Sequence, residues 1–254
     1  MAYMTAWCTD VGIRKKTNQD SALLMQADSS YGPLLMAAIC DGMGGLSKGE
    51  VASACVTERL KEWFTRELII LLGQEEFPVA LYHSWNRLIE EQNKRIASYG
   101  QQQRVNMGTT VAVLLLVGDN YYIMNIGDSR IYLLSDQICQ LTHDQTFVQK
   151  EMDAGRMTEE EARQDSRRNV LLQCVGASNV VVPDFFMGGI NPDTRYLLCC
   201  DGFRHEISPE EIYEKLSIMG APTQQQMQQG LCELVDMNKD RQEVDNITAL
   251  LIHV

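Results

Sequence analysis

Aspartate residues stand beside turns at five places along the chain, next to short apolar runs that have the composition of strands. Cys40 and Cys200 each end such a run, and an Asp-Gly pair follows both directly. A single Asp-Gly pair is more often a turn than a ligand, because Asp caps the local backbone and Gly accepts positive φ. The five segments are Asn18-Gln19-Asp20, Asp41-Gly42-Met43-Gly44-Gly45, Gly127-Asp128-Ser129-Arg130, Asp201-Gly202 and Asp245-Asn246.

A carboxylate at the end of a buried strand is held rigidly and lies near protein of low dielectric constant. Several such carboxylates at one sheet edge would repel one another unless a cation neutralised their charge. Hard divalent ions such as Mg²⁺ and Mn²⁺ prefer oxygen ligands of this type. A glycine after the aspartate also lets a metal ion or a phosphate approach the backbone closely. The pattern therefore favours a shared metal site over five independent turns.

Strands are predicted at both ends of the chain, with helices in the gaps between them. Helices are expected from a capping box at Ser47-x-x-Glu50 to about Leu72, after Pro78, and from the Ser208-Pro209 cap. Helices inserted among meandering strands predict an α+β fold, with antiparallel sheets stacked face to face and helices outside. The predicted strands are 21–27, 33–40, 109–117, 121–126, 130–134, 180–187, 195–200 and 247–254.

Length and composition predict a single domain over residues 1–254. Of the 254 residues 45% are hydrophobic, and no Pro/Gly/Ser-rich linker divides the chain. The formal net charge of −12 argues against nucleic acid and anionic lipid as partners, since both are polyanions. No apolar run approaches the length of a membrane helix, so no membrane span is expected. The chain ends at the last predicted strand without a coiled coil or tail, which suggests a monomer.

The cysteines indicate a reducing compartment. The chain contains eight of them, and no two form a C-x-x-C pair. Most lie inside apolar runs, so buried free thiols are favoured over a disulfide framework or a zinc site. The N-terminus also lacks the basic region and apolar block of a secretory signal. We therefore expect a cytoplasmic protein.

The five aspartate segments, taken with Gly12 and Gly108-Thr109-Thr110, resemble the type 2C metal-dependent protein serine/threonine phosphatases (the PPM family). The order and rough spacing match from about residue 5 to the C-terminus. Two further segments, Leu141-Thr142-His143-Asp144 and Arg167-Arg168-Asn169-Val170-Leu171, resemble the compact bacterial members. The resemblance implies a four-layer αββα sandwich, in which two antiparallel sheets are flanked by helices.

The resemblance also implies a role for each aspartate around two divalent cations, Mn²⁺ or Mg²⁺. Asp41 would bridge the two ions, and Gly42 would ligate one through its backbone carbonyl. Asp201 and Asp245 would complete the shell of the second ion, and Asp20 would act mainly through metal-bound water. The ions would lower the pKa of a bridging water, and the resulting hydroxide would attack phosphorus.

Two positions leave alternatives open. The family usually has an arginine three residues after the glycine at Gly12, where it grips the substrate phosphate, but Lys15 stands there. Lysine cannot make a two-pronged bond to phosphate, so either Lys15 substitutes with looser geometry or Arg14 swings in. Asp128 would hold a third, weaker metal as in some bacterial relatives, or it would cap its own turn and pair with Arg130.

The proton donor and the site entrance also depart from the common pattern. Met43 stands where many eukaryotic members have histidine, so a metal-bound water is expected to protonate the leaving group. His143 and His205 are expected to be structural or carried by a flap. Residues 142–168, with a capping box at Thr158-x-x-Glu161, match the flap over the entrance, although an ordinary surface helix pair has the same pattern. Arg204, near the mouth of the site, would add affinity for phosphate.

The activity that the resemblance implies is hydrolysis of phosphoserine and phosphothreonine in proteins, as part of bacterial signalling that opposes a cognate Ser/Thr kinase. Two alternatives remain: a phosphatase-like binding module without activity, and a hydrolase of small phosphate esters that uses the same site. The retained Asp20, Asp41, Asp201 and Asp245 argue against the inactive module, since a dead relative usually loses ligands.

Overall fold

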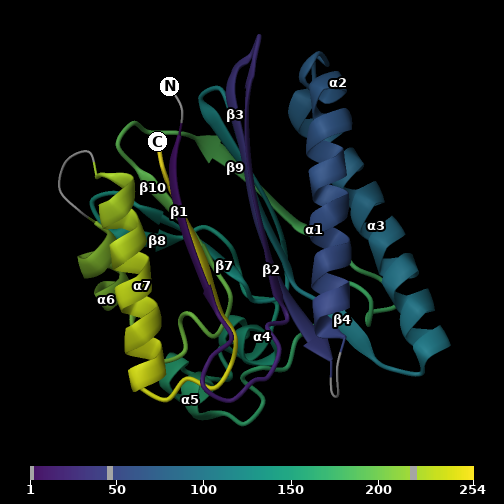
Figure 1. Cartoon of the computed structure of the whole chain (residues 1–254). Coiled ribbons are helices and arrows are strands. Elements are labelled where there is room, and N and C mark those ends of the chain that lie inside the picture. Colours follow the sequence, from purple (N-terminus) through teal and green to yellow (C-terminus); the bar gives the residue numbers. More distant parts are fainter. Residues whose placement is uncertain (1–2, 45–47, 218–221) are drawn as a thin grey trace.

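Two antiparallel β-sheets stack face to face, and helices cover the outer face of each sheet (Figure 1). The computed structural model describes residues 3–44, 48–217 and 222–254. Sheet A has the strand order β1-β11-β10-β7-β8, and sheet B has the order β2-β3-β5-β6-β9, with β4 paired to β3. The predicted α+β class and its four-layer αββα arrangement are confirmed.

The strands of each sheet come from distant parts of the chain. Sheet A contains β1 (Met4–Asp10), β11 (Ile247–His253), β10 (Arg195–Cys199), β7 (Arg130–Leu134) and β8 (Ile138–Gln140). Sheet B contains β2 (Asp20–Ser29), β3 (Gly32–Gly44), β4 (Met107–Thr109), β5 (Val111–Val117), β6 (Asn120–Ile126) and β9 (Asp184–Gly189).

The helices form the outer layers. In Figure 1, α1 (Gly49–Arg66), α2 (Leu68–Leu72) and α3 (Phe77–Gln103) lie on the side of sheet B. On the side of sheet A lie α6 (Pro209–Leu216) and α7 (Gln224–Asp240). The short helices α4 (Phe147–Asp153) and α5 (Glu159–Gln164) lie at the lower end of the sandwich. No helix of the described ranges is long and apolar enough to cross a bilayer.

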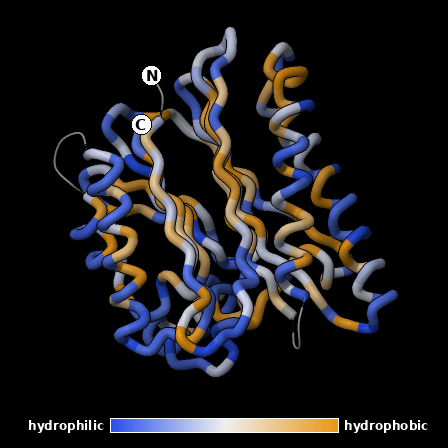
Figure 2. Tube along the Cα trace, in the orientation of Figure 1, coloured by the Kyte–Doolittle hydropathy of each residue, from blue (hydrophilic) through white to orange (hydrophobic). Residues whose placement is uncertain are grey.

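Alternate side chains of the central strands fill two separate cores. Leu35, Ala37 and Ile39 of β3 belong to the core between the two sheets. Their neighbours Met36 and Ala38 belong to the core between sheet B and its helices. A strand that is buried on both faces is apolar at every position, which explains the continuous hydrophobic runs in the sequence and in Figure 2.

The helical predictions hold, with one interruption. The apolar side chains that recur at helical spacing along α3 share one face and are buried in the core beside sheet B; they are Leu81, Trp85, Leu88, Ile89 and Ile96. The long helix predicted to reach Leu72 breaks at Glu67 into α1 and α2. Ser47, the first residue of the predicted capping box, lies outside the described residues. The capping box at Thr158 and the helix start at Ser208 are confirmed, and at both places the hydroxyl accepts the N–H of the glutamate three residues later.

Two strand predictions needed correction, and two strands were not predicted. The strand predicted over 109–117 is interrupted at Thr110 and forms β4 and β5. The strand predicted to begin at Val180 begins at Asp184 instead, directly after Pro183, because proline cannot donate a hydrogen bond to a ladder. The two strands at the edges of sheet A were not predicted: β1, and β8, whose three residues carry too little pattern.

Candidate metal centre

The two sheets bring the five aspartates to the same end of the sandwich. Asp20 begins β2 and lies directly opposite Asp41 of β3 in the sheet register. Asp128 lies in the turn between β6 and β7, Asp201 follows β10, and Asp245 lies two residues before β11. A cavity of about 200 Å³ opens at this end, and its lining consists of Lys15, Gln19, Asp41, Gly42, Met43, Asp128, Asn169, Leu171, Asp201 and Asp245.

The interruption at Thr110 fixes the backbone of Asp41. The Asp41 N–H donates to Thr110 Oγ1 at 2.9 Å, and the Thr110 N–H donates to the Asp41 carbonyl at 2.9 Å. The Thr109 hydroxyl donates to the same carbonyl at 3.0 Å. In a regular antiparallel ladder, the Asp41 N–H would donate to a backbone carbonyl of the neighbouring strand and not to the Thr110 side chain. The break that the sequence did not predict therefore holds the central carboxylate in place.

Gly42 must be glycine because three backbone segments meet there. A Cβ at this position would collide with the carbonyl oxygens of Gln19 and Gly49. The Gly42 N–H also donates to the Gln19 carbonyl at 3.1 Å. The close approach keeps the Gly42 backbone at the wall of the cavity, where its carbonyl could act as a ligand.

The carboxylates strongly disfavour one another's ionisation. Burial raises the pKa of Asp41 well above its usual value, and the charges of Asp20 and Asp201 raise it further. Burial likewise raises the pKa of Asp20 to about 6, and the Thr248 hydroxyl, which donates to it at 2.6 Å, only partly opposes the effect. Burial raises the pKa of Asp128 to about 7. A divalent cation among these oxygens would stabilise their ionised forms.

Within the described ranges, two buried carboxylate oxygens at this end of the sandwich have no hydrogen-bond partner. They are Asp20 Oδ1 and Asp201 Oδ1. Buried polar atoms are normally bonded, so an orphaned carboxylate oxygen in a cavity indicates that it serves a ligand. In the described ranges, no three or more His, Cys, Asp or Glu side chains lie close enough together to hold a metal ion by themselves. The donors present are carboxylate oxygens and the Gly42 backbone carbonyl, and such oxygen donors fit hard divalent ions like Mg²⁺ and Mn²⁺, which complete their coordination with water.

Of the two basic residues predicted to bind phosphate, only Lys15 reaches the cavity. Its ammonium lies 2.9 Å from Asp245 Oδ1 and lines the cavity, whereas Arg14 is exposed and is absent from the lining. Asn246 secures this loop, because its side-chain amide donates to the carbonyls of Val11 and Thr17. The Asn246 oxygen in turn accepts the Gln19 N–H at 2.9 Å.

The alternative in which Asp128 pairs with Arg130 is wrong. Arg130 instead makes a two-pronged bond to Asp144, with Nε–Oδ1 at 2.8 Å and Nη2–Oδ2 at 2.7 Å. The Asp128 carboxylate lies 3.5 Å from Arg204. Position in the sequence favoured Arg130, but β7 directs its side chain toward the residues that follow β8.

Neither histidine is free for proton transfer in the cavity. His143 is exposed, and its Nε2 lies 3.3 Å from Asp153. His205 is buried between Glu243, at 3.2 Å from Nδ1, and Asp201, at 3.5 Å from Nε2. Glu243, which sequence reasoning missed, also accepts the backbone N–H groups of Val244 and Asp245. It therefore supports two of the predicted ligands at once, and its only sequence signal is its nearness to Asp245.

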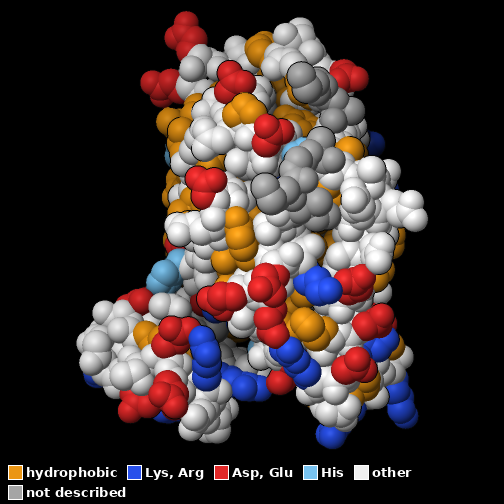
Figure 3. Space-filling model, turned by 90° about the vertical axis from the view of Figure 1, so that its left-hand side faces the viewer, with side chains coloured by type: hydrophobic (Ala, Val, Ile, Leu, Met, Phe, Trp, Pro, Cys, Tyr) orange, Lys and Arg blue, Asp and Glu red, His pale blue; other side chains and the backbone are white. Residues whose placement is uncertain are grey.

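A second cavity, of about 810 Å³, adjoins the first and shares Asp128 and Asn169 with it. Side chains of α4, α5 and the segment 204–211 line it, so residues 142–168 do lie beside the candidate metal centre. Arg204 lines this larger cavity and not the smaller one. Figure 3 views the molecule from the side of α6 and α7, and it shows charged side chains of both signs around a hollow at the lower end.

Comparisons with known proteins agree with this geometry. The family model for protein phosphatase 2C matches residues 13–236. A Streptococcus pyogenes serotype M6 protein named as protein phosphatase 2C-type is 32% identical over 248 residues, which are 96% of this chain and 95% of the relative. A serine/threonine phosphatase, stp, of Listeria monocytogenes serotype 4b is 31% identical over 211 residues, covering 82% of this chain and 81% of the relative.

A solved structure supports the same assignment. The catalytic domain of the serine/threonine protein phosphatase PstP, solved in complex with two manganese ions, superposes with a TM-score of 0.79 at 30% identity. The superposition covers 99% of this chain and 97% of that domain. Sequence, fold and the gathered carboxylates agree, and the chain belongs to the protein phosphatase 2C family of metal-dependent phosphoprotein phosphatases.

Proposed function

We propose that this protein hydrolyses phosphoserine and phosphothreonine monoesters in other proteins with two divalent cations, Mn²⁺ or Mg²⁺. The observation that carries the proposal is the convergence of Asp41, Asp201 and Asp245 on one small cavity that also presents the Lys15 ammonium. Asp20 lies directly behind this group, opposite Asp41 in the sheet register. The two manganese ions in the PstP catalytic domain support the number and type of the cations.

Each residue has a separate task in this proposal. Asp41 would be shared by the two ions, the Gly42 carbonyl would complete the first, and Asp201 and Asp245 would hold the second. Asp20 acts through water, in keeping with its unpartnered oxygen in the interior. When bound, the ions offset the charge of the carboxylates and the phosphate and activate water for attack on phosphorus.

The chain's own residues orient the substrate. Lys15 attracts the non-bridging phosphate oxygens, and its link to Asp245 sets where the ammonium lies. Lysine acts here as a point charge, so it fixes the distance of the phosphate more than its orientation. Residues 142–168 form a flap beside the entrance, within a single catalytic domain that spans 1–254.

The proposed setting is the cytoplasm, with a cognate Ser/Thr kinase among the phosphorylated partners. All eight cysteines are free thiols in the structure, as a reducing compartment requires. The net charge of −12 favours a soluble monomer by mutual repulsion and disfavours binding to nucleic acid.

Removal of divalent cations is expected to abolish the activity. Phosphothreonine and phosphoserine peptides should be hydrolysed with Mn²⁺ and left intact with EDTA, and added Mn²⁺ should restore the rate. Phosphate release measured with both peptides and with p-nitrophenyl phosphate tests the proposal against its alternatives. Hydrolysis of the small ester alone would favour a small-ester hydrolase, and no hydrolysis by metal-loaded protein would favour a binding module.

Replacement of Lys15 is expected to weaken substrate binding more than turnover. A hydrogen bond to a charged group contributes about 1.5–3 kcal/mol, so Lys15→Met should raise KM for a phosphopeptide by roughly tenfold or more. Arg14→Met is the matched control, because Arg14 is exposed and outside the cavity lining. Equal effects of the two substitutions on KM would remove Lys15 from the phosphate site.

A further inference from the structure

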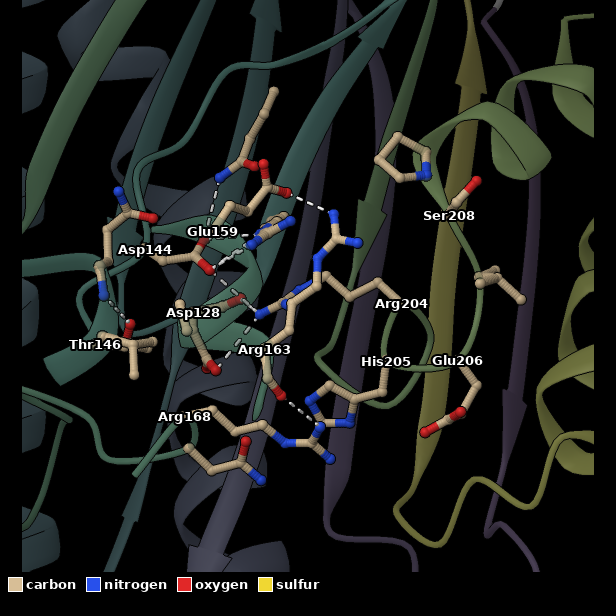
Figure 4. Close-up of a pocket in the computed structure, with 18 of the residues that line it drawn as sticks. Asp128, Asp144, Thr146, Glu159, Arg163, Arg168, Arg204, His205, Glu206 and Ser208 are labelled. Carbon is tan, nitrogen blue, oxygen red and sulfur yellow. Dashed lines mark hydrogen bonds and ion pairs between the residues drawn. The ribbon is translucent and has the colours of Figure 1, made fainter. Parts of the chain in front are cut away.

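Two buried carboxylates and two partly buried guanidinium groups form one network beside the metal centre. Arg130 binds Asp144, and Arg204 lies between Asp144, at 3.4 Å, and Asp128, at 3.5 Å. The exposed fractions of Arg204, Asp128 and Asp144 are only 13%, 8% and 6%. Figure 4 shows the Arg204 side chain reaching toward Asp128 and Asp144 in the wall of the larger cavity. When both aspartates are ionised, their two charges equal those of the two guanidinium groups, without an added ion.

Arg204 holds the backbone of Asp128 as well as its charge. Its Nη2 donates to the Asp128 carbonyl at 2.9 Å. This contact fixes the turn between β6 and β7, and Asp128 lies in the lining of both cavities. The guanidinium therefore meets Asp128 at the wall of the larger cavity, whereas Asp41, Asp201 and Asp245 line the smaller one.

The same short turn carries Asp201 and Arg204. The Arg204 N–H donates to the Asp201 carbonyl at 3.0 Å, which closes the turn after β10. Asn238 of α7 secures it by donating to the Phe203 carbonyl at 2.9 Å. A proposed ligand of the second ion and the cation beside Asp128 are therefore placed by one rigid segment.

We propose that Arg204 is a positioning residue that takes the place of a third cation at Asp128, so that the centre takes up two divalent ions and Asp128 ligates neither. The inference rests on the proposed two-ion function. A divalent ion bound to Asp128 would lie close to a buried guanidinium, and the two like charges would repel each other. The Asp128 carboxylate can bind either the Arg204 guanidinium or an additional ion. The hydrogen bond from the Arg204 N–H to the Asp201 carbonyl holds Arg204 in place, which favours the guanidinium.

Counting bound manganese tests this inference. Calorimetric titration of the metal-free protein, with manganese analysis after dialysis at saturating Mn²⁺, should give two ions per chain. Arg204→Met, which removes the charge and keeps most of the side-chain volume, should bind a third ion about tenfold or more weakly than the first two. Arg204→Met combined with Asp128→Asn should return the number to two, because the additional ion needs the Asp128 carboxylate.

Three control variants test whether a change in the number of bound manganese ions is specific to the charge of Arg204. Arg163→Met removes another arginine of the same cavity, one that is exposed and paired with Glu159, and should leave two ions. Arg204→Lys keeps a positive charge and should also leave two. Asp128→Asn alone should still bind two, which provides a test even if Arg204→Met does not fold.

The outcomes separate this inference from the proposed function. Three ions bound by the wild-type protein, loss of an ion in Asp128→Asn, or an unchanged count in folded Arg204→Met would each overturn the role of Arg204. Those results would leave phosphopeptide hydrolysis untouched. Conversely, two ions bound by a protein that hydrolyses no phosphopeptide would overturn the proposed function and leave the role of Arg204 standing.

Discussion

Asp41→Asn is expected to lower phosphopeptide hydrolysis by about a thousandfold or more and to weaken Mn²⁺ binding at both proposed positions. The substitution keeps the shape of the side chain but removes the charge that both ions would share. A thousandfold loss corresponds to about 4 kcal/mol of transition-state stabilisation, which is within the range attributed to a catalytic ion. The rate with a phosphothreonine peptide and a Mn²⁺ titration of each protein measure the two effects.

Asp28→Asn provides the matched control. Asp28 lies on β2 at the opposite end of the sheet, opposite Pro33, and its side chain is exposed. The same chemical change there should leave both activity and metal binding intact. An Asp41→Asn protein that kept wild-type turnover at saturating Mn²⁺ would exclude the proposed bridging role of Asp41.

Asp144→Asn should be the most destabilising of the charge substitutions, lowering the free energy of unfolding by about 3 kcal/mol. Asp144 is 6% exposed and accepts hydrogen bonds from Arg130 and from Gln140. Without its charge, Arg130 and Arg204 remain buried and face each other without the carboxylate that separates them. Urea unfolding, followed by circular dichroism at constant metal concentration, measures the difference.

The free energy of unfolding that Asp144→Asn loses should depend on pH in a defined direction. Burial acts to raise the pKa of Asp144, but Arg204 and Arg130 outweigh it, so the pKa lies below the ordinary value. Stability from a lowered pKa is present above the unfolded value of about 3.9 and is lost as the pH falls through the folded value. The difference in free energy of unfolding between wild type and Asp144→Asn should therefore be largest between about pH 5 and 7. It should become smaller as the pH falls below about 4.

Glu159→Gln is the control for this comparison, because Glu159 and its partner Arg163 are 75% and 72% exposed. An exposed pair contributes little, so the substitution should leave the unfolding curve almost unchanged. An Asp144→Asn protein as stable as the Glu159→Gln protein would show that the buried network is not a source of stability.

The sequence predicted the elements best where burial imposes a period. The face of α3 and the apolar runs of β3 and β5 follow from local spacing, because each side chain has only one core to enter. It failed where tertiary contacts interrupt a regular element. The break at Thr110 has no local signal, since its cause is a hydrogen bond to Asp41, which lies 69 positions earlier.

The sequence by itself determined most of the strands and helices, in their order, and the placement of aspartates at strand ends. The resemblance to a known family rested on that same order. Only the tertiary structure decided which charged groups meet. It brings Lys15 rather than Arg14 to the cavity, pairs Arg130 with Asp144, and places Arg204 beside Asp128. Charge pairing depends on distances between segments far apart in the chain, and no local period encodes those distances.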